Sequence, residues 1–247
     1  MQGILFRIIE TEDGLIQYHN IIPTEYVVQQ FVDLPLEFSV FHVRYPGEKQ
    51  GRLTGFILKE YLSVEGDGQS TLLALIEKND RTQLRLEELK AKHKHKLDLV
   101  VPAHEKYYLS FAGNHNRGAK FINLHKEIDD KLHHIFDTIS NECQTFFYGR
   151  YDLKCTSLDD LRAGKNISIL EFNGTGAEPN HIYDCNFTYT QALKEIAIHW
   201  RHMYKIGRIN NALGVPYWSF NKGTKHLIKA KKLFKSLRKF DLELVIA

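Results

Sequence analysis

Charged and amide side chains recur at alternate positions in two β-rich stretches in the middle of the chain. In the first stretch, Arg150 and Asp152 lie two residues apart, so the period of a strand places them side by side on one face. In the second, the same rule places Glu171 and Asn173 at the end of an apolar face of isoleucines. The pattern predicts that Glu171 and Asn173, at the end of one strand, lie beside Arg150 and Asp152 on another strand.

A short helix is expected between the two strands. Ser157 is a candidate N-cap, Asp160 follows it by three residues as in a capping box, and Gly164 is suited to end the helix. A connection this short lets the two strands lie antiparallel and adjacent.

In that arrangement Asp152, Glu171 and Asn173 offer convergent oxygen atoms. Such oxygens suit a hard cation such as Mg²⁺, which binds its ligands at about 2.0 to 2.1 Å. Arg150 supplies a planar fork for a phosphate or carboxylate. The alternative is a plain strand pair with solvated acids, in which Arg150 pairs with Asp152.

The runs 149–152 (Gly-Arg-Tyr-Asp) and 171–174 (Glu-Phe-Asn-Gly) resemble the nucleotide and metal motif of the ATP-grasp superfamily. The resemblance is strongest to its D-alanine–D-alanine ligase-like and cyanophycin-synthetase-like carboxylate-amine ligases. It implies that Asp152, Glu171 and Asn173 bind two Mg²⁺ ions, or Mn²⁺, that bridge the ATP phosphates. It also implies that Arg150 stabilises an acyl-phosphate intermediate.

Further segments follow the order of the same family. The stretch 30–40 resembles the hinge of ATP-grasp enzymes, which implies that Gln30 and the backbone of Phe31 and Val32 face the adenine. Glu37, seven residues after Gln30, would hold the ribose, and Lys59 would contact the phosphates. The alternatives are an edge turn with a solvated Glu37 and a solvent-facing Lys59.

The loop 112–121 resembles the acceptor-binding loop of these ligases. Two glycines flank polar and basic side chains there, and the resemblance assigns Asn114 and Arg117 to the substrate, with Arg117 facing its carboxylate. The alternative is an ordinary polar turn. The tail 174–184 departs from the small-residue loop usual in the ligases, so the substrate stays open.

Hydrophobic periodicity and turn residues predict the other elements. Strands are expected at 3–9 and 25–32, a hairpin at 36–44 and 53–64, and a strand at 107–111. Helices are expected at 11–19, from 71, at 81–97, 124–140, 188–206 and 226–240, with a loop from 207. The last helix is strongly basic, and a solvated face is favoured there over nucleic-acid binding.

Composition sets outer limits. The 247 residues are 43% hydrophobic with a formal charge of +3, which fits a globular protein and does not by itself indicate a nucleic-acid partner. Three cysteines without metal-type spacing favour reduced thiols. No signal peptide or apolar run of about 20 residues is recognised, so a cytoplasmic protein without membrane partners is expected.

The mixture of hairpins and helices predicts an α+β fold. The resemblance implies two lobes that enclose ATP: about 1–33 as the remainder of the first lobe, about 34–220 as the second, and about 221–247 as a basic helix. The implied activity joins a carboxylate to an amine of a small molecule or peptide through an acyl phosphate. An ATP-binding protein without turnover and a basic nucleic-acid-associated protein are the alternatives, and a homodimer is left open.

The resemblance also implies that this sequence lacks a part of the enzyme. In the family, an N-terminal α/β domain, a phosphate-contacting lysine and most of a glycine-rich loop precede the strand matched here at Gly3. The expectation is weak binding of magnesium-ATP and poor turnover by the isolated chain.

Overall fold

The computed structural model describes residues 4–246 and the side chains of residues 4–241. Its main feature is a five-stranded sheet in the order β5-β2-β1-β6-β7, in which every neighbouring pair is antiparallel. The strands are β1 (Leu36–Val43), β2 (Arg52–Glu60), β5 (Lys120–Asn123), β6 (Tyr148–Cys155) and β7 (Ile167–Asn173). The predicted hairpin at 36–64 and the predicted antiparallel pair of β6 and β7 are confirmed.

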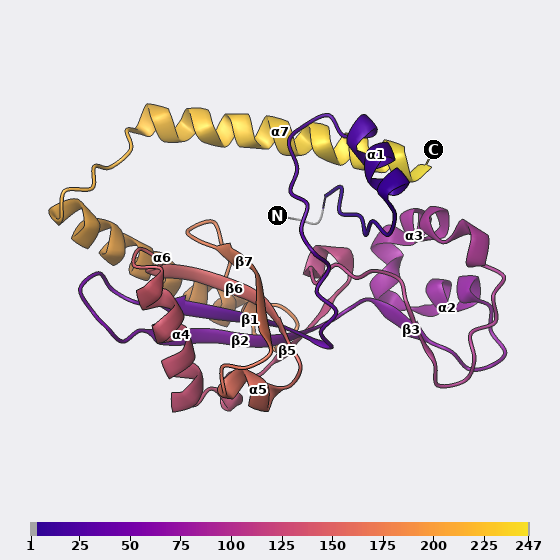
Figure 1. Cartoon of the computed structure of the whole chain (residues 1–247), viewed down its shortest axis with the longest axis horizontal. Coiled ribbons are helices and arrows are strands. Elements are labelled where there is room, and N and C mark those ends of the chain that lie inside the picture. Colours follow the sequence, from indigo (N-terminus) through magenta and orange to yellow (C-terminus); the bar gives the residue numbers. More distant parts are fainter. Residues whose placement is uncertain (1–3, 247) are drawn as a thin grey trace.

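The core lies between one face of this sheet and two helices, α4 (Asp130–Glu142) and α5 (Leu158–Arg162) (Figure 1). Alternate residues of the strands are apolar, so they gather on that face. Ser157 caps α5 by accepting from the backbone of Asp160, as predicted. The cluster is made of Phe38, Val40, Leu53, Phe56, Leu132, Phe136, Tyr151, Leu153, Cys155 and Leu161.

Helix α6 (Tyr189–Ala212) covers one end of the opposite face, where Phe41, Val43 and Tyr148 pack against Ile206. A capping box between Thr188 and Gln191 begins the helix. The helix continues past Ile206, so the loop expected from residue 207 is wrong. A single glycine costs a helix only about 1 kcal/mol, and burial of Ile206 favours continuation.

A small second unit is inserted between β2 and β5. Its two strands are β3 (Ser63–Glu65) and β4 (Lys106–Tyr108), and its helices are α2 (Leu72–Lys78) and α3 (Leu86–Lys92), with short 3₁₀ turns at Asp80–Arg85 and Lys94–Lys96. Thr71 caps α2, rather than Ser70. The unit has its own core of Leu62, Val64, Leu72, Ile76, Leu89, Val101 and Leu109.

The N-terminal region holds α1 (Glu12–Ile21), close to the helix expected at 11–19. The two strands expected around it are wrong: over the described part of 3–9, and throughout 25–32, no strand forms. Phe6, Val27 and Val28 remain exposed. β-propensity reflects packing on a neighbouring strand, and these runs pair with none in the described part of the chain.

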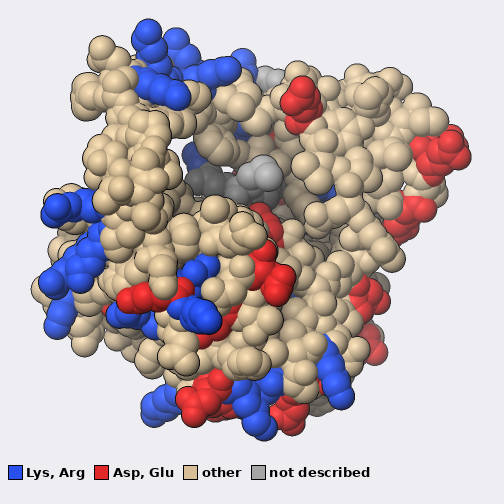
Figure 2. All heavy atoms as spheres, turned by 60° about the vertical axis from the view of Figure 1, so that its left-hand side comes forward, with Lys and Arg blue, Asp and Glu red and all other residues tan. Residues whose placement is uncertain are grey.

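Helix α7 (Phe220–Ile246) crosses above the sheet and reaches α3 (Figure 1). It begins six residues before the helix expected at 226. Eight Lys and Arg side chains between 222 and 239 are exposed, and Figure 2 shows Lys and Arg gathered at the upper edge, where α7 lies. Near its end, Asp241 pairs with Arg7 and Arg117. Over the described residues, no helix is long and apolar enough to cross a membrane.

Candidate functional site

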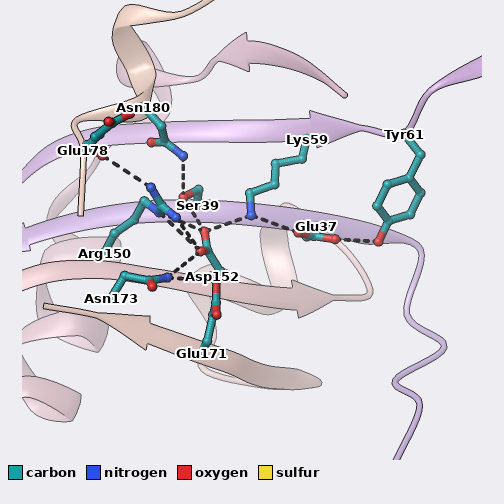
Figure 3. A network of polar contacts seen from close by, with 10 residues as sticks. All are labelled: Glu37, Ser39, Lys59, Tyr61, Arg150, Asp152, Glu171, Asn173, Glu178 and Asn180. Carbon is teal, nitrogen blue, oxygen red and sulfur yellow. Dashed lines mark hydrogen bonds and ion pairs between the residues drawn. The ribbon is translucent and has the colours of Figure 1, made fainter. Parts of the chain in front are cut away.

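The second face of the sheet carries a row of polar side chains over four adjacent strands (Figure 3). The register places them opposite one another across neighbouring strands: Glu37 faces Lys59, Ser39 faces Asp152, Asp152 faces Glu171, and Arg150 faces Asn173. Because alternate residues share a face, the apolar core on one side and this polar row on the other come from the same strands.

Asp152 is the centre of the network and is only 2% exposed. Its Oδ1 accepts a hydrogen bond from Ser39 at 2.6 Å and lies 2.9 Å from Nζ of Lys59. Its Oδ2 lies 2.9 Å from Nη2 of Arg150. Burial disfavours the ionised carboxyl, but the charges of Lys59 and Arg150 outweigh it and hold the pKa of Asp152 well below its usual value.

A β-bulge in β7 decides which side chains join this row. Asp152 pairs with Glu171 but the next residue, Leu153, pairs with Ile169, so Leu170 is an extra residue on β7. Ile167 therefore packs with the core, while Glu171 turns to the polar face. The expectation that the isoleucines share one face with Glu171 is wrong, because a strict period of two does not pass through a bulge.

Asn173 links the two carboxylates. Its Nδ2 donates to Oδ2 of Asp152 at 3.0 Å and to Oε1 of Glu171 at 2.9 Å. The three predicted metal ligands are thus brought together, but the amide presents its nitrogen rather than its oxygen. Rotation of the amide by about half a turn would offer a third oxygen, which is favourable only with a cation between the carboxylates. This donor set fits Mg²⁺ or Mn²⁺.

Glu37 and Lys59 form a buried ion pair beside this centre. Nζ of Lys59 donates to Oε1 of Glu37 at 2.9 Å, and the hydroxyl of Tyr61 donates to Oε2 of Glu37. Burial lowers the pKa of Lys59, but Asp152 and Glu37 more than compensate, so the pKa is raised. Burial, followed by the charge of Glu37, raises the pKa of Tyr61. Lys59 stays protonated and holds two acids.

The segment predicted to face the adenine is held against the same face by Lys154. Nζ of Lys154 donates to the carbonyl of Val32 at 2.9 Å and lies 5.2 Å from the ring centre of Phe31. Gln30 is exposed on the same segment. Sequence reasoning missed Lys154, although the alternation from Arg150 through Asp152 pointed to it.

The loop predicted to bind the acceptor reaches the site at Gly113, where an added Cβ would overlap Oε1 of Glu37. Asn114 accepts from the backbone of Asn116 and starts a 3₁₀ turn, His115–Arg117. Arg117 points elsewhere: it pairs with Glu88 at 2.9 Å and with Asp241 at 2.8 Å. Binding a substrate carboxylate would require Arg117 to exchange one of these partners.

The loop after β7 also enters the network. Nη1 of Arg150 donates to the carbonyl of Glu178 at 3.4 Å, and Nδ2 of Asn180 donates to Ser39 at 3.0 Å. Asn180 begins a 3₁₀ turn, Asn180–Ile182. Sequence reasoning missed Ser39 and Asn180. Ser39 carried a signal, since it alternates with Glu37, whereas the loop has no periodicity.

Comparison with known proteins adds little to this geometry. No protein-family model and no curated protein matches the chain. Among solved structures, a bifunctional glutathione synthetase from Pasteurella multocida is similar with a TM-score of 0.45 and 15% identity, over 68% of this chain and 24% of that chain. The chain thus spans about a quarter of that protein. The structure itself confirms the predicted α+β architecture with antiparallel sheets.

Proposed function

We propose that this chain binds magnesium-ATP on the polar face of the sheet and uses it to join a carboxylate to an amine. The observation that carries the proposal is the meeting of Asp152, Glu171 and Asn173 at one point, with Arg150 beside them. Two acids, an amide and an arginine in this arrangement form a site for a hard cation and a phosphate, and their motif resembles that of ATP-grasp ligases.

Each group has a defined role in this proposal. Asp152, Glu171 and Asn173 hold the metal, which would neutralise charge on the transferring phosphoryl group. ATP phosphorylates the carboxylate, and the amine then displaces phosphate. Arg150 stabilises the negative charge that develops on the oxygen of the tetrahedral intermediate, a role worth on the order of 3 kcal/mol for one well-placed donor.

The nucleotide would extend from this centre toward the segment held by Lys154. Residues 30–32 would face the adenine and Glu37 the ribose, with residues to about 33 in a first lobe and about 34–220 in the second. Lys59 is paired with Asp152. A metal that takes over Asp152 would release the ammonium group of Lys59 from one of its two acids, so that it could contact a phosphate while still paired with Glu37.

A second candidate is an ATP-binding protein without turnover. The observation that favours it is that Arg150 and Lys59 are committed within the chain: Arg150 pairs with Asp152, and Lys59 pairs with Asp152 and Glu37. Measuring phosphate release with a panel of amino acids and short peptides separates the candidates, because only the ligase releases phosphate in a substrate-dependent way.

Calorimetry with ATP, with and without Mg²⁺, tests the shared part of both candidates. Glu171→Gln keeps the shape of the side chain but removes its charge, so it should weaken magnesium-dependent ATP binding while leaving the fold intact. Glu142→Gln, at an exposed position at the end of α4, is the matched control and should bind as the parent does. Unchanged binding by Glu171→Gln would overturn the metal assignment.

A further inference from the structure

A second cluster of ligating side chains lies outside the proposed nucleotide site. Nε2 of His181 lies 3.1 Å from Oε1 of Glu195, and Nε2 of His199 lies 3.3 Å from the same oxygen. One atom from each residue lies within 4.8 Å of the other two. The two imidazoles are buried, at 5% and 1% exposure, so both face one carboxylate away from solvent.

Two separate parts of the fold contribute residues to this cluster. Glu195 and His199 are four residues apart on α6 and therefore share one side of the helix. His181 comes from the 3₁₀ turn after β7, and its ring fits against β2 only because Gly55 has no side chain, since a Cβ there would overlap the imidazole.

The hydrogen bonds around the cluster leave a ring nitrogen free. Nδ1 of His199 contacts the hydroxyl of Tyr148 at 3.1 Å, while its buried Nε2 has no hydrogen-bond partner among the described residues. If Nδ1 donates to Tyr148, Nε2 presents a lone pair toward Glu195. A second bond that fixes the ring and its tautomer is typical of histidines that bind metals.

Glu195 places one carboxylate oxygen between the two imidazoles. An anionic oxygen facing two nitrogens is a mixed nitrogen and oxygen donor set, which borderline transition metals prefer and Mg²⁺ does not.

We propose that His181, Glu195 and His199 form a binding site for a divalent transition metal, with Zn²⁺ as the favoured ion. In a tetrahedral zinc site with bonds of about 2.0 to 2.1 Å, neighbouring donors lie about 3.3 Å apart, close to the 3.1 and 3.3 Å from Oε1 of Glu195 to the two histidine nitrogens. Two histidines and one glutamate leave a fourth position for water.

The ion would connect the loop after β7 to α6. His181 directly follows Asn180, whose amide donates to Ser39 beside Asp152. A metal at His181 would therefore fix Asn180 and hold the polar network of the neighbouring site in place. This site is separate from the proposed magnesium site in both its residues and its donor chemistry, so its test requires no nucleotide.

The experiment uses the full chain, stripped of metal with a chelator and then titrated with Co²⁺ and Zn²⁺. We expect one ion per chain after gel filtration, visible absorption bands of four-coordinate Co²⁺, and loss of those bands as Zn²⁺ replaces it. If the parent chain retains no ion, the proposal is overturned, and no variant is needed to show it.

Variants locate the ion. His199→Gln and Glu195→Gln should each lower the affinity for Zn²⁺ by more than about 100-fold, beyond the 10- to 100-fold typical of groups that only support ligands. His202→Gln is the matched control: its ring centre lies 6.3 Å from that of His199, and its Nδ1 contacts Tyr45 instead. Circular dichroism checks that each variant is folded. If His199→Gln does not fold, the zinc affinity of Glu195→Gln decides the test.

Two results would overturn the assignment. One is zinc affinity that is unchanged in both His199→Gln and Glu195→Gln, which would show that the cluster is held by hydrogen bonds alone. The other is loss of zinc in Asp152→Asn, which would place the ion at the neighbouring site. Retention of zinc in Asp152→Asn supports the proposal.

Discussion

Lys59 and Asp152 form an ion pair across an intervening strand. Lys59 lies on β2 and Asp152 on β6, and both flank β1, yet Nζ and Oδ1 are 2.9 Å apart. Their side chains are 5% and 3% exposed. The long lysine side chain reaches across β1, where Ser39 donates to the same oxygen. The pair therefore joins three strands at the centre of the proposed site.

Replacing Lys59 with Met should strongly destabilise the protein. The substitution keeps the volume of the side chain but leaves Asp152 and Glu37 buried without their shared cation. Breaking a buried pair in this way costs about 3 to 5 kcal/mol. Urea denaturation followed by circular dichroism measures the change in the free energy of unfolding.

Lys120→Met is the control for this prediction, because Lys120 is exposed on the edge strand β5 and should change stability by less than about 0.5 kcal/mol. Adding Asp152→Asn to Lys59→Met should cost less than the sum of the two single changes. Strict additivity would show that the two side chains do not stabilise each other.

Measurements of nucleotide binding should distinguish the role of Glu37 from that of Lys59. If Glu37 holds the ribose, Glu37→Gln weakens ATP and adenosine alike, on the order of 1.5 to 3 kcal/mol for a charged acceptor. Lys59→Met should weaken ATP far more than adenosine. Calorimetry at a temperature where each variant is folded gives both affinities.

The exposed Glu60 at the end of β2 supplies a control, Glu60→Gln, that should bind both ligands as the parent does. Because Glu37 and Lys59 are paired, the double variant belongs in the same series. Adenosine that responds equally to both single changes would contradict the placement of the ribose at Glu37.

Acid should destabilise the protein through His42. This residue is 1% exposed, and its Nε2 contacts Oδ1 of Asp137 at 2.9 Å. Its Nδ1 is buried without a hydrogen-bond partner among the described residues, so a second proton there would have no acceptor. Burial lowers the pKa of His42, and the contact with Asp137 only partly compensates.

The sign of the pH effect follows from that shift. A depressed pKa in the folded state means that the unfolded state binds the proton more readily. The contribution of neutral His42 to the free energy of unfolding is therefore present above about pH 6.5 and is lost as pH falls. The slope should approach about 1.4 kcal/mol per pH unit at most. Urea midpoints from pH 7.5 to 5.5 measure it. His42→Asn should flatten the profile, whereas His134→Gln, exposed on α4, should keep it.

The hairpin, the Ser157 cap and the pairing of Arg150 with Asp152 were readable from the sequence because each depends on residues close together in the chain. The bulge at Leu170 was not, since one extra residue reverses a face without any clear compositional sign. Arg117 and Asp241 are 124 positions apart, so no local pattern could show that the predicted substrate contact has partners within the chain. The pairing of Lys59 with Asp152 could not be predicted either, because it depends on the order of strands in the sheet.

The strands expected before residue 34 failed for a related reason. The run 25–32 has residues with high β-propensity, but that propensity reflects packing on a neighbouring strand, and this run pairs with none in the described part of the chain. In the structure Lys154 holds the carbonyl of Val32 instead. At Val32 the backbone carbonyl thus accepts from a side chain and not from a neighbouring strand.

Gly113 should tolerate no side chain, because an added Cβ would overlap Oε1 of Glu37, the oxygen that accepts from Lys59. Gly113→Ala must move either the loop or the carboxylate, and loss of the buried ion-pair geometry should cost about 1 to 3 kcal/mol of unfolding free energy.

Gly207→Ala is the matched control with the opposite sign: Gly207 lies inside α6, where an added Cβ meets nothing within 4 Å. Alanine should stabilise that helix by about 0.5 to 1 kcal/mol. Equal effects of the two substitutions in thermal or urea denaturation would show that the loop at Gly113 does not rest on Glu37.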